Sequence, residues 1–285
     1  MAKATDETFN GLSGKEWTLL SKNVWDDVSS PREAYQIEHG STFPLALAER
    51  VIRLYSKEGD LVFDPFVGVG TTVIAAAKME RDAIGIELQK KFCDTAKRIL
   101  DEEKTDLFGQ KRSRQAVVCD DCRNLLEYVD RDSVQVTLTS APYANFSRRD
   151  RSRVYKRAIS PASDANAKPG AFSIFSEDFG NLGYEEYTEE LKKIFKKVFD
   201  VTKPGGYCVW VVKDYRDTQS GIPYVSVHSD ITNFGVSAGW LHHDLIIWDQ
   251  NDQRRLMLLG FPNVFYSNQN CAFLVVFRKP ERVTA

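Results

Sequence analysis

Four consecutive residues, Ser140, Ala141, Pro142 and Tyr143, follow the apolar run 134–139 and are suited to chemistry on a planar amino group. The Ser140 hydroxyl and the Ala141 carbonyl each offer an acceptor oxygen, and the Tyr143 ring offers a flat surface for stacking. Pro142 fixes the turn and removes a backbone donor. Proline turns at strand ends are common, so this tetrapeptide predicts an amino-group pocket only together with a partner segment.

That partner lies upstream, where Asp64 to Thr72 read Asp-Pro-Phe-Val-Gly-Val-Gly-Thr-Thr between a predicted strand and a predicted helix. Gly68 and Gly70 allow the backbone to come close to a ligand, and the helix start supplies unpaired N–H groups. The pattern lacks the third glycine of a dinucleotide fingerprint. Asp64 suits an ammonium group better than a pyrophosphate, because a phosphate repels acids.

Two further acids end the next two predicted strands. Glu87, 23 residues after Asp64, stands where a ribose-hydroxyl acceptor is usual in such a sheet. Asp121, in the pair Asp120-Asp121, is placed to accept a hydrogen bond from an adenine amino group. Each acid alone has an alternative role as a helix N-terminal acid. Three successive strands that end in acids indicate a nucleoside that also bears an amino acid, and S-adenosylmethionine fits that description.

The composition is that of an ordinary soluble globular protein, with 42% hydrophobic and 27% charged residues and a net charge of −2. No apolar stretch approaches the roughly 20 residues of a membrane span, and the polar N-terminus argues against a secretory signal. Five scattered cysteines are typical of reduced thiols, so we expect a cytoplasmic protein without membrane contact. Cys119 and Cys122 form a lone C-x-x-C, which disfavours a metal site.

A basic segment begins five residues after Tyr143, with six bases and one acid between positions 148 and 157. Such a segment is suited to a phosphate backbone or to guanine edges, although a charge run is more often simply solvated. Its position beside the tetrapeptide favours nucleic-acid contact, and Arg254 and Arg255 are weaker candidates. The predicted DNA-binding residues are Arg148, Arg149, Arg151, Arg153, Lys156, Arg157, Arg254 and Arg255.

Apolar runs that alternate with helical patterns predict an α/β domain with a mostly parallel sheet. We expect a single domain over residues 1–285, with a ligand half at about 39–130 and a catalytic half at about 131–285. Two long stretches, 144–183 and 249–270, fit no strand–helix alternation and are predicted recognition insertions. The predicted strands are 61–66, 83–88, 116–120, 134–139, 207–213, 241–248 and 272–279; the predicted helices are 43–56, 71–79, 89–104 and 184–202, the last ending at Lys-Pro-Gly-Gly.

Taken in order, these motifs resemble the amino-directed DNA methyltransferases, which modify cytosine N4 or adenine N6, over about residues 17–280. The resemblance implies a Rossmann-like seven-stranded sheet with an antiparallel C-terminal strand and helices on both faces. In that family the tetrapeptide normally has proline where this chain has Ala141, a change that keeps the carbonyl but loses one rigid φ. The implied residues for binding S-adenosylmethionine are His39, Thr42, Phe43, Pro44, Asp64, Pro65, Phe66, Gly68, Gly70, Thr71, Thr72, Glu87, Leu88, Asp121 and Cys122.

The resemblance further implies methyl transfer to the N4 atom of a flipped cytosine in double-stranded DNA. Ser140 and Ala141 would accept the amino hydrogens, and Tyr143 would stack on the base. Serine at the first position favours cytosine, and adenine N6 stays open. Cytosine C5 chemistry is disfavoured because none of the five cysteines follows a proline. A restriction endonuclease is a possible companion, and the enzyme is expected to be a monomer or a homodimer.

Two rival hypotheses stay open. Related tetrapeptides, usually with asparagine or aspartate first, act on RNA or on protein amides. Alternatively, Ala141 marks a nucleic-acid binder that has kept the cofactor fold but lost catalysis.

Overall fold

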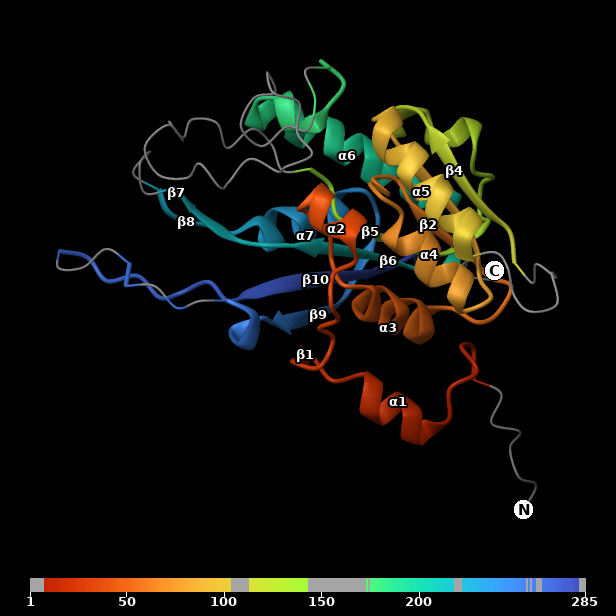
Figure 1. Ribbon diagram of the computed structural model, residues 1–285, viewed down its shortest axis with the longest axis horizontal. Coiled ribbons are helices and arrows are strands. Elements are labelled where there is room, and N and C mark those ends of the chain that lie inside the picture. The colour runs from red at the N-terminus through yellow and green to blue at the C-terminus, as the bar shows by residue number, and fades with distance from the viewer. Residues whose placement is uncertain are drawn as a thin grey trace.

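The computed structural model describes residues 8–103, 113–142, 173, 175–217, 222–254, 256, 258–259 and 263–281. Its centre is a mixed sheet with the strand order β1-β9-β10-β6-β5-β2-β3-β4, and β7 and β8 form a separate two-stranded sheet (Figure 1). The strands are β1 (Val24–Trp25), β2 (Leu61–Asp64), β3 (Asp82–Glu87), β4 (Gln115–Cys119), β5 (Val134–Thr139), β6 (Thr202–Val212), β7 (Tyr215–Asp217), β8 (Ile222–Val225), β9 (Leu241–Asp249) and β10 (Cys271–Arg278).

Strand direction determines which loops meet. The neighbours from β6 through β5, β2 and β3 to β4 are all parallel. Only β10 is reversed in the main sheet, antiparallel to both β6 and β9. Because the carboxyl ends of parallel strands lie at one edge, the segments after β2, β3, β4, β5 and β6 gather there.

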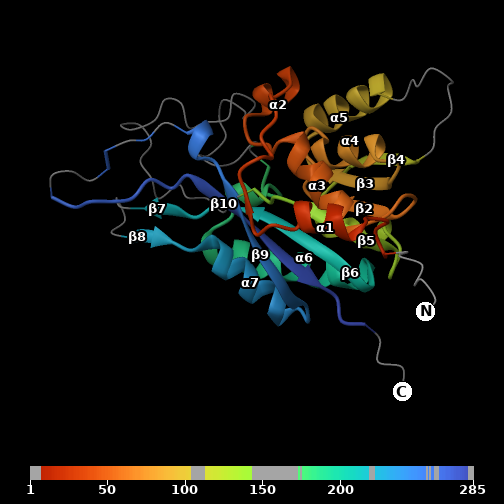
Figure 2. The same ribbon diagram turned by 90° about the horizontal axis from the view of Figure 1, so that it is seen from below.

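Helices cover both faces of the sheet (Figures 1 and 2). One hydrophobic cluster joins α3, α4 and α5 to the sheet, and a second joins α6, α7 and the short helix η1 (Cys122–Glu127) to the opposite face. In Figure 1, α1 lies outside α3, away from the sheet. The helices are α1 (Gly14–Leu20), α2 (Ala34–His39), α3 (Leu45–Tyr55), α4 (Thr71–Lys78), α5 (Lys90–Glu103), α6 (Tyr184–Val201) and α7 (Val227–Ser237).

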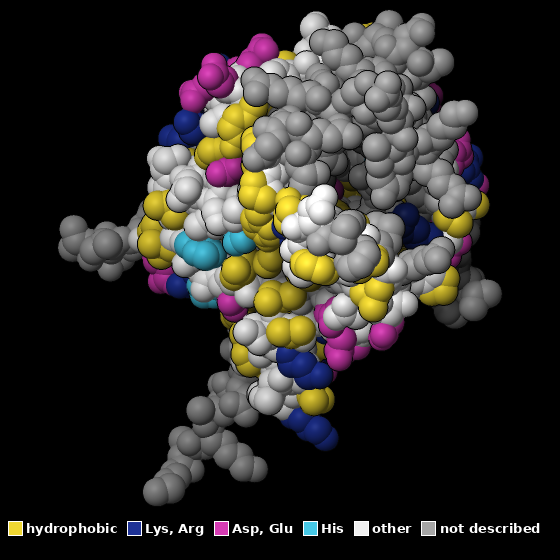
Figure 3. All heavy atoms as spheres, turned by 90° about the vertical axis from the view of Figure 1, so that its left-hand side faces the viewer, with side chains coloured by type: hydrophobic (Ala, Val, Ile, Leu, Met, Phe, Trp, Pro, Cys, Tyr) yellow, Lys and Arg dark blue, Asp and Glu magenta, His cyan; other side chains and the backbone are white. Residues whose placement is uncertain are grey.

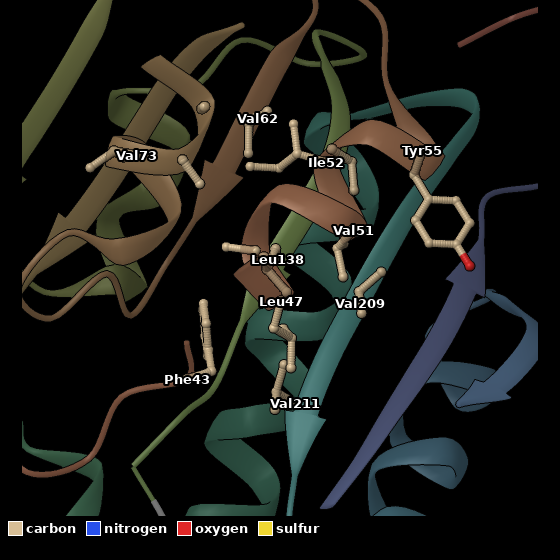
Figure 4. Packing of buried hydrophobic residues seen from close by; sticks show 14 of the residues in the cluster. Phe43, Leu47, Val51, Ile52, Tyr55, Val62, Val73, Leu138, Val209 and Val211 are labelled. Atoms are coloured by element: carbon tan, nitrogen blue, oxygen red, sulfur yellow. The ribbon is translucent and has the colours of Figure 1, made fainter. Parts of the chain in front are cut away.

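The apolar spacing of α3 explains where it packs. Leu47 and Val51 lie one turn apart, so they share a helix face, and both are fully buried. Figure 4 shows them lying toward Leu138 of β5 and toward Val209 and Val211 of β6. Burying such aliphatic side chains stabilises the fold by about 1.5–3 kcal/mol each. This packing fixes the helix that follows the N-terminal segment against the strand that leads to Ser140.

The expected architecture is confirmed, with all seven predicted strands and all four predicted helices in place within a few residues. The sheet gains an eighth strand because β1 pairs with the outer edge of β9. The helices α1, α2 and α7 and the β7–β8 hairpin were not predicted from the sequence. In α7 the buried positions are only Ile231, Phe234 and Gly235, a spacing too sparse to stand out.

The Lys-Pro-Gly-Gly segment, at which the predicted helix 184–202 ends, is part of a strand. The helix does end before it, at Val201, but residues 203–206 belong to β6. Val134 pairs with Thr202 and Val136 already pairs with Tyr207, so the intervening residues bulge out of register. Gly205 has φ +77°, a conformation that L side chains rarely adopt, which explains the glycine at this bulge.

Candidate functional site

Asp64 joins three elements of the sheet edge. Its side chain is buried, and its carboxylate accepts hydrogen bonds from the hydroxyls of Thr72 on α4 (2.6 Å) and Thr139 on β5 (2.7 Å). The Phe66 amide donates a third bond of 3.0 Å. Burial raises the pKa of Asp64 to about 6, although these three bonds oppose the shift. The predicted ligand acid therefore also holds the loop that carries it.

The two glycines of the loop between β2 and α4 both have positive φ, at +55° for Gly68 and +94° for Gly70. A Cβ on Gly70 would come within 2.9 Å of the Ala96 Cβ of α5, closer than real Cβ atoms approach. At Gly68 it would lie 3.3 Å from Nε2 of His39. The loop therefore packs tightly against both α5 and the N-terminal segment, and only glycine fits at Gly70.

Glu87 binds the same loop from the end of β3. One carboxylate oxygen accepts the Gly68 amide at 3.0 Å and the other accepts the Gln89 amide at 2.8 Å. Burial raises the pKa of Glu87 to about 7, and the nearby Asp178 and Asp64 carboxylates add to the rise. A cationic ligand beside the loop would stabilise the ionised form of both buried carboxyls.

The N-terminal segment with His39 lies against this loop. The buried Gln36 amide donates to the Thr71 hydroxyl at 3.2 Å and thus ties α2 to the start of α4. The His39 ring is buried and contacts the Phe92 ring, with centroids 4.4 Å apart. Burial, with a contribution from Lys91, lowers the pKa of His39 to about 4, so the imidazole is neutral at pH 7.

The third acid, Asp121, follows β4 and caps η1. One of its oxygens accepts the Arg123 amide at 2.8 Å, and the other accepts Nη1 of Arg123 at 2.6 Å. Cys122, beside it, is buried, and burial raises the pKa of its thiol. The neighbouring Asp120 points elsewhere and accepts the Tyr128 hydroxyl at 2.6 Å. Of the acid pair, Asp121 alone is held by Arg123.

The tetrapeptide leaves β5 at the same edge. Ser140 directly follows Thr139, the residue that bonds Asp64, and Ala141 is buried in the cluster on the α6 face. Figure 3 faces the side of the molecule that lies at the left in Figure 1, and hydrophobic side chains gather near its centre. Because Thr139 bonds the Asp64 carboxylate, the predicted acceptors Ser140 and Ala141 directly follow a residue that contacts the glycine loop.

Several predicted site residues lie outside the described residues. They are Tyr143, Arg148, Arg149, Arg151, Arg153, Lys156, Arg157 and Arg255. Arg254 is described and exposed, and its Nε donates to the Gln250 side chain at 2.7 Å.

Three residues of this site escaped the sequence analysis: Gln36, Thr139 and Arg123. Thr139 had a detectable signal, since a polar residue ending an apolar run next to Ser140 is suspect. Gln36 and Arg123 had none, because their partners lie elsewhere in the sequence. In the described ranges no helix is long and apolar enough to span a membrane, and no cluster of His, Cys, Asp or Glu there is arranged to hold a metal ion.

Comparison with known proteins agrees with this geometry. Residues 4–98 match the model of a family described as DNA methylase, the N6/N4 methylases. The chain is 34% identical over 108 residues to the type II methyltransferase M.BglI of Bacillus subtilis, covering 38% of this chain and 29% of that protein. It is 42% identical over 78 residues to the orphan methyltransferase M.BamHII of Bacillus amyloliquefaciens, covering 26% and 29%.

Over its N-terminal third the chain is therefore similar to the amino-directed DNA methyltransferases, and S-adenosylmethionine is the cofactor that this similarity supports. The chain aligns with less than a third of the length of each of these two relatives. A solved SAM-dependent methyltransferase from Methanosarcina mazei superposes with a TM-score of 0.49 at 13% identity, covering 81% of this chain and 98% of that one.

The residues at the sheet edge fit this cofactor, which carries an ammonium and a sulfonium. Asp64 and Glu87 supply negative charge beside the glycine loop. The Thr42 hydroxyl, in the segment beside that loop, is buried and lacks a hydrogen-bond partner among the described residues. A buried hydroxyl without a partner is costly, so a ligand that bonds it would be favoured.

Proposed function

We propose that the chain is a site-specific DNA methyltransferase that acts on the exocyclic N4 of a flipped cytosine. The observation that carries the proposal is the Thr139–Asp64 hydrogen bond of 2.7 Å, which joins the strand of the tetrapeptide to the cofactor loop. Through it, a base held at Ser140 and a ligand held at Gly68 would share one rigid edge of the sheet.

In this proposal the cofactor residues are those that surround the loop. Glu87 would accept the ribose hydroxyls, Asp121 would accept the adenine amino group, and Thr42 would bond the amino-acid end. Asp64 would act mainly by fixing the loop, since three donors already bind its carboxylate. The cofactor, when bound, supplies a methyl group on a positively charged sulfur.

Ser140 and Ala141 would orient the target. An exocyclic amino nitrogen is a poor nucleophile because its lone pair is delocalised into the ring. If the Ser140 hydroxyl and the Ala141 carbonyl accept both amino hydrogens, the nitrogen becomes tetrahedral and its lone pair points out of the ring plane. Alignment of this kind can supply a large part of a rate enhancement. Tyr143 would stack on the flipped base and keep it in place.

The remaining assignments also belong to this proposal. We propose one catalytic domain with a cofactor half at about 39–130 and a catalytic half at about 131–285. The arginines and lysine between positions 148 and 157, with Arg254 and Arg255, would contact double-stranded DNA. Such phosphate contacts predict an affinity that falls steeply with salt.

The test uses unmethylated duplex DNA, S-adenosylmethionine and mass spectrometry of the digested nucleosides. We expect N4-methylcytosine from the wild type, and a loss of at least about 100-fold in kcat for Ser140→Ala, in line with removal of one positioned hydrogen-bond partner of a reacting group. Ser140→Ala should still bind S-adenosylhomocysteine like the wild type. Arg98→Gln, which breaks an exposed ion pair on α5, is the matched control and should keep full activity.

Each other product would correct a particular part of the proposal. Formation of N6-methyladenine would change the proposed target base from cytosine to adenine and would leave the enzyme class, a DNA methyltransferase, unchanged. Methyl transfer only to RNA or protein would overturn the DNA assignment. DNA binding without any methylated product would identify a nucleic-acid binder with a retained cofactor fold.

A further inference from the structure

Arg123 contacts residues from three separate parts of the molecule. Its Nη1 binds Asp121 at 2.6 Å, and its Nε binds Glu190 of α6 at 2.7 Å. The same Nη1 donates to the Glu177 carbonyl at 3.2 Å. Lys197 of α6 also donates to the Arg123 carbonyl. One guanidinium thus connects the end of β4, α6 and the chain around residue 177.

The residues 175–182 form the third part and reach the cofactor loop. The Arg123 guanidinium lies 4.7 Å from the centre of the Phe179 ring. Phe179 in turn packs edge-on against Phe66 of the loop, with centroids 5.3 Å apart. Asp178 is buried and stabilises the turn by accepting from the Gly180 amide at 2.8 Å. Although these residues fall in the predicted recognition insertion 144–183, they pack against the cofactor loop.

Burial makes the Arg123 contacts strong. The side chains of Arg123, Asp121 and Glu190 are only 26%, 16% and 19% exposed. Half-buried ion pairs with direct N–H···O bonds hold their partners more firmly than exposed ones. Since Arg123 occupies one site on each Asp121 oxygen, it orients the carboxylate and leaves further lone pairs for a second donor.

We propose that Arg123 is a positioning residue that couples occupancy of the adenine end of the cofactor site to the placement of residues 175–182. This inference rests on the proposed function, which gives Asp121 the adenine amino group. A ligand that bonds Asp121 favours the carboxylate orientation that Arg123 also favours. The guanidinium then holds Glu177 and Phe179 in place, and binding is reciprocally tighter when they are in place.

The experiment measures S-adenosylhomocysteine binding by calorimetry and backbone hydrogen exchange with and without this ligand. For Arg123→Gln we expect about tenfold weaker binding, the size of one lost charge-assisted hydrogen bond. In the wild type, saturating ligand should slow exchange both in the loop 64–72 and in residues 175–182. In Arg123→Gln at saturating ligand, we expect the loop to be protected as before and residues 175–182 to lose their response.

Two further variants separate coupling from a purely structural role. Glu190→Gln removes one anchor of Arg123 but keeps Asp121 paired, so the exchange response of 175–182 should weaken with an affinity loss of less than about threefold, as for a weaker neutral partner. Arg98→Gln is the control for the loss of one arginine and should match the wild type in both measurements.

Three outcomes would overturn the inference. Unchanged binding and exchange in Arg123→Gln, with normal ligand binding by the wild type, would remove the coupling and leave the proposed function intact. Equal loss of protection in 64–72 and 175–182 would show that Arg123 only supports the fold. No binding of S-adenosylhomocysteine by the wild type would overturn the cofactor assignment and this inference with it.

Discussion

The Thr139 hydroxyl donates a hydrogen bond of 2.7 Å to the buried carboxylate of Asp64, across two neighbouring parallel strands. The two residues are far apart in sequence, yet each adjoins a predicted site segment. Asp64 begins the glycine loop, and Thr139 precedes Ser140. This hydrogen bond therefore adds a direct side-chain link between the two halves of the candidate site, beside the pairing of β2 with β5 and the Thr72 bond to the Leu138 carbonyl.

Removing this bond should destabilise the protein. Thr139→Val keeps the shape of the side chain but leaves a buried carboxylate oxygen with one donor fewer, so we expect the free energy of unfolding to fall by about 1–3 kcal/mol. Thr137→Val is the matched control, because the Thr137 hydroxyl is on the same strand and buried, without a partner in the described part of the chain. Urea unfolding of both variants checks the prediction; equal losses would show that the bond contributes nothing.

Ligand affinity should depend on pH through Glu87. Its pKa is raised to about 7 in the free protein, so the carboxyl is largely protonated at pH 6. Ribose hydroxyls prefer the ionised acceptor, and binding should therefore release a proton and tighten as pH rises from 6 to 8. Calorimetry of S-adenosylhomocysteine in buffers of different ionisation enthalpy measures this release. Glu87→Gln should bind more weakly with a flat profile over this range, whereas Glu102→Gln on the exposed face of α5 should keep the wild-type slope.

The same acids make the opposite prediction for stability without ligand. Asp64 and Glu87 have pKa values of about 6 and about 7 in the folded chain, above their ordinary values. A raised carboxyl pKa means that the folded state binds more protons than the unfolded state between about pH 4 and pH 7. The stabilising contribution of these two carboxyls to the free energy of unfolding should thus be present at low pH and disappear as the pH rises to about 7. The difference between the wild type and Glu87→Gln in the pH dependence of the free energy of unfolding isolates the contribution of Glu87. A stabilising contribution of Glu87 that grows with pH would contradict the prediction.

Gly70 should tolerate no side chain. Gly70→Ala combines a strained φ of +94° with a Cβ that would lie 2.9 Å from Ala96, so we expect a loss of about 2–4 kcal/mol in unfolding free energy. Gly59→Ala separates the two causes, because Gly59 has φ +78° with nothing within 4 Å of an added Cβ. That variant should lose only about 1 kcal/mol. Chemical denaturation of both variants measures these losses. If Gly59→Ala loses as much unfolding free energy as Gly70→Ala, the whole effect comes from backbone strain at positive φ.

The N-terminal segment should be part of the folding unit. Trp25 is fully buried, whereas Trp17 is 39% exposed. Trp25→Ala should cost about 3–5 kcal/mol, as for other large buried side chains, while Trp17→Ala should cost less than about 1 kcal/mol. Thermal unfolding of the two variants provides the measurement. Similar melting temperatures would show that the segment does not contribute to the domain core.

The sequence by itself determined the fold class and predicted the motifs that lie at the carboxyl edge of the sheet. Apolar runs and the 3.6-residue helical spacing are local patterns, so they located β2 to β6 and helices such as α3 and α6 within a few residues. The acids and glycines were found because each follows a strand end, where the topology of a parallel sheet already gathers ligands. The cofactor class followed from that order of residue types.

Tertiary structure decided which partners these residues have. Thr139 reaches Asp64, and Arg123 reaches Asp121 and Glu190, only because strand order and helix packing bring separate segments together. It also placed residues 175–182 against Phe66 of the cofactor loop, where the sequence predicted only a recognition insertion. Hydrogen bonds and ion pairs depend on distances of a few ångströms between atoms. Local residue patterns carry no information on such distances, and only the packed sheet and its helices define them.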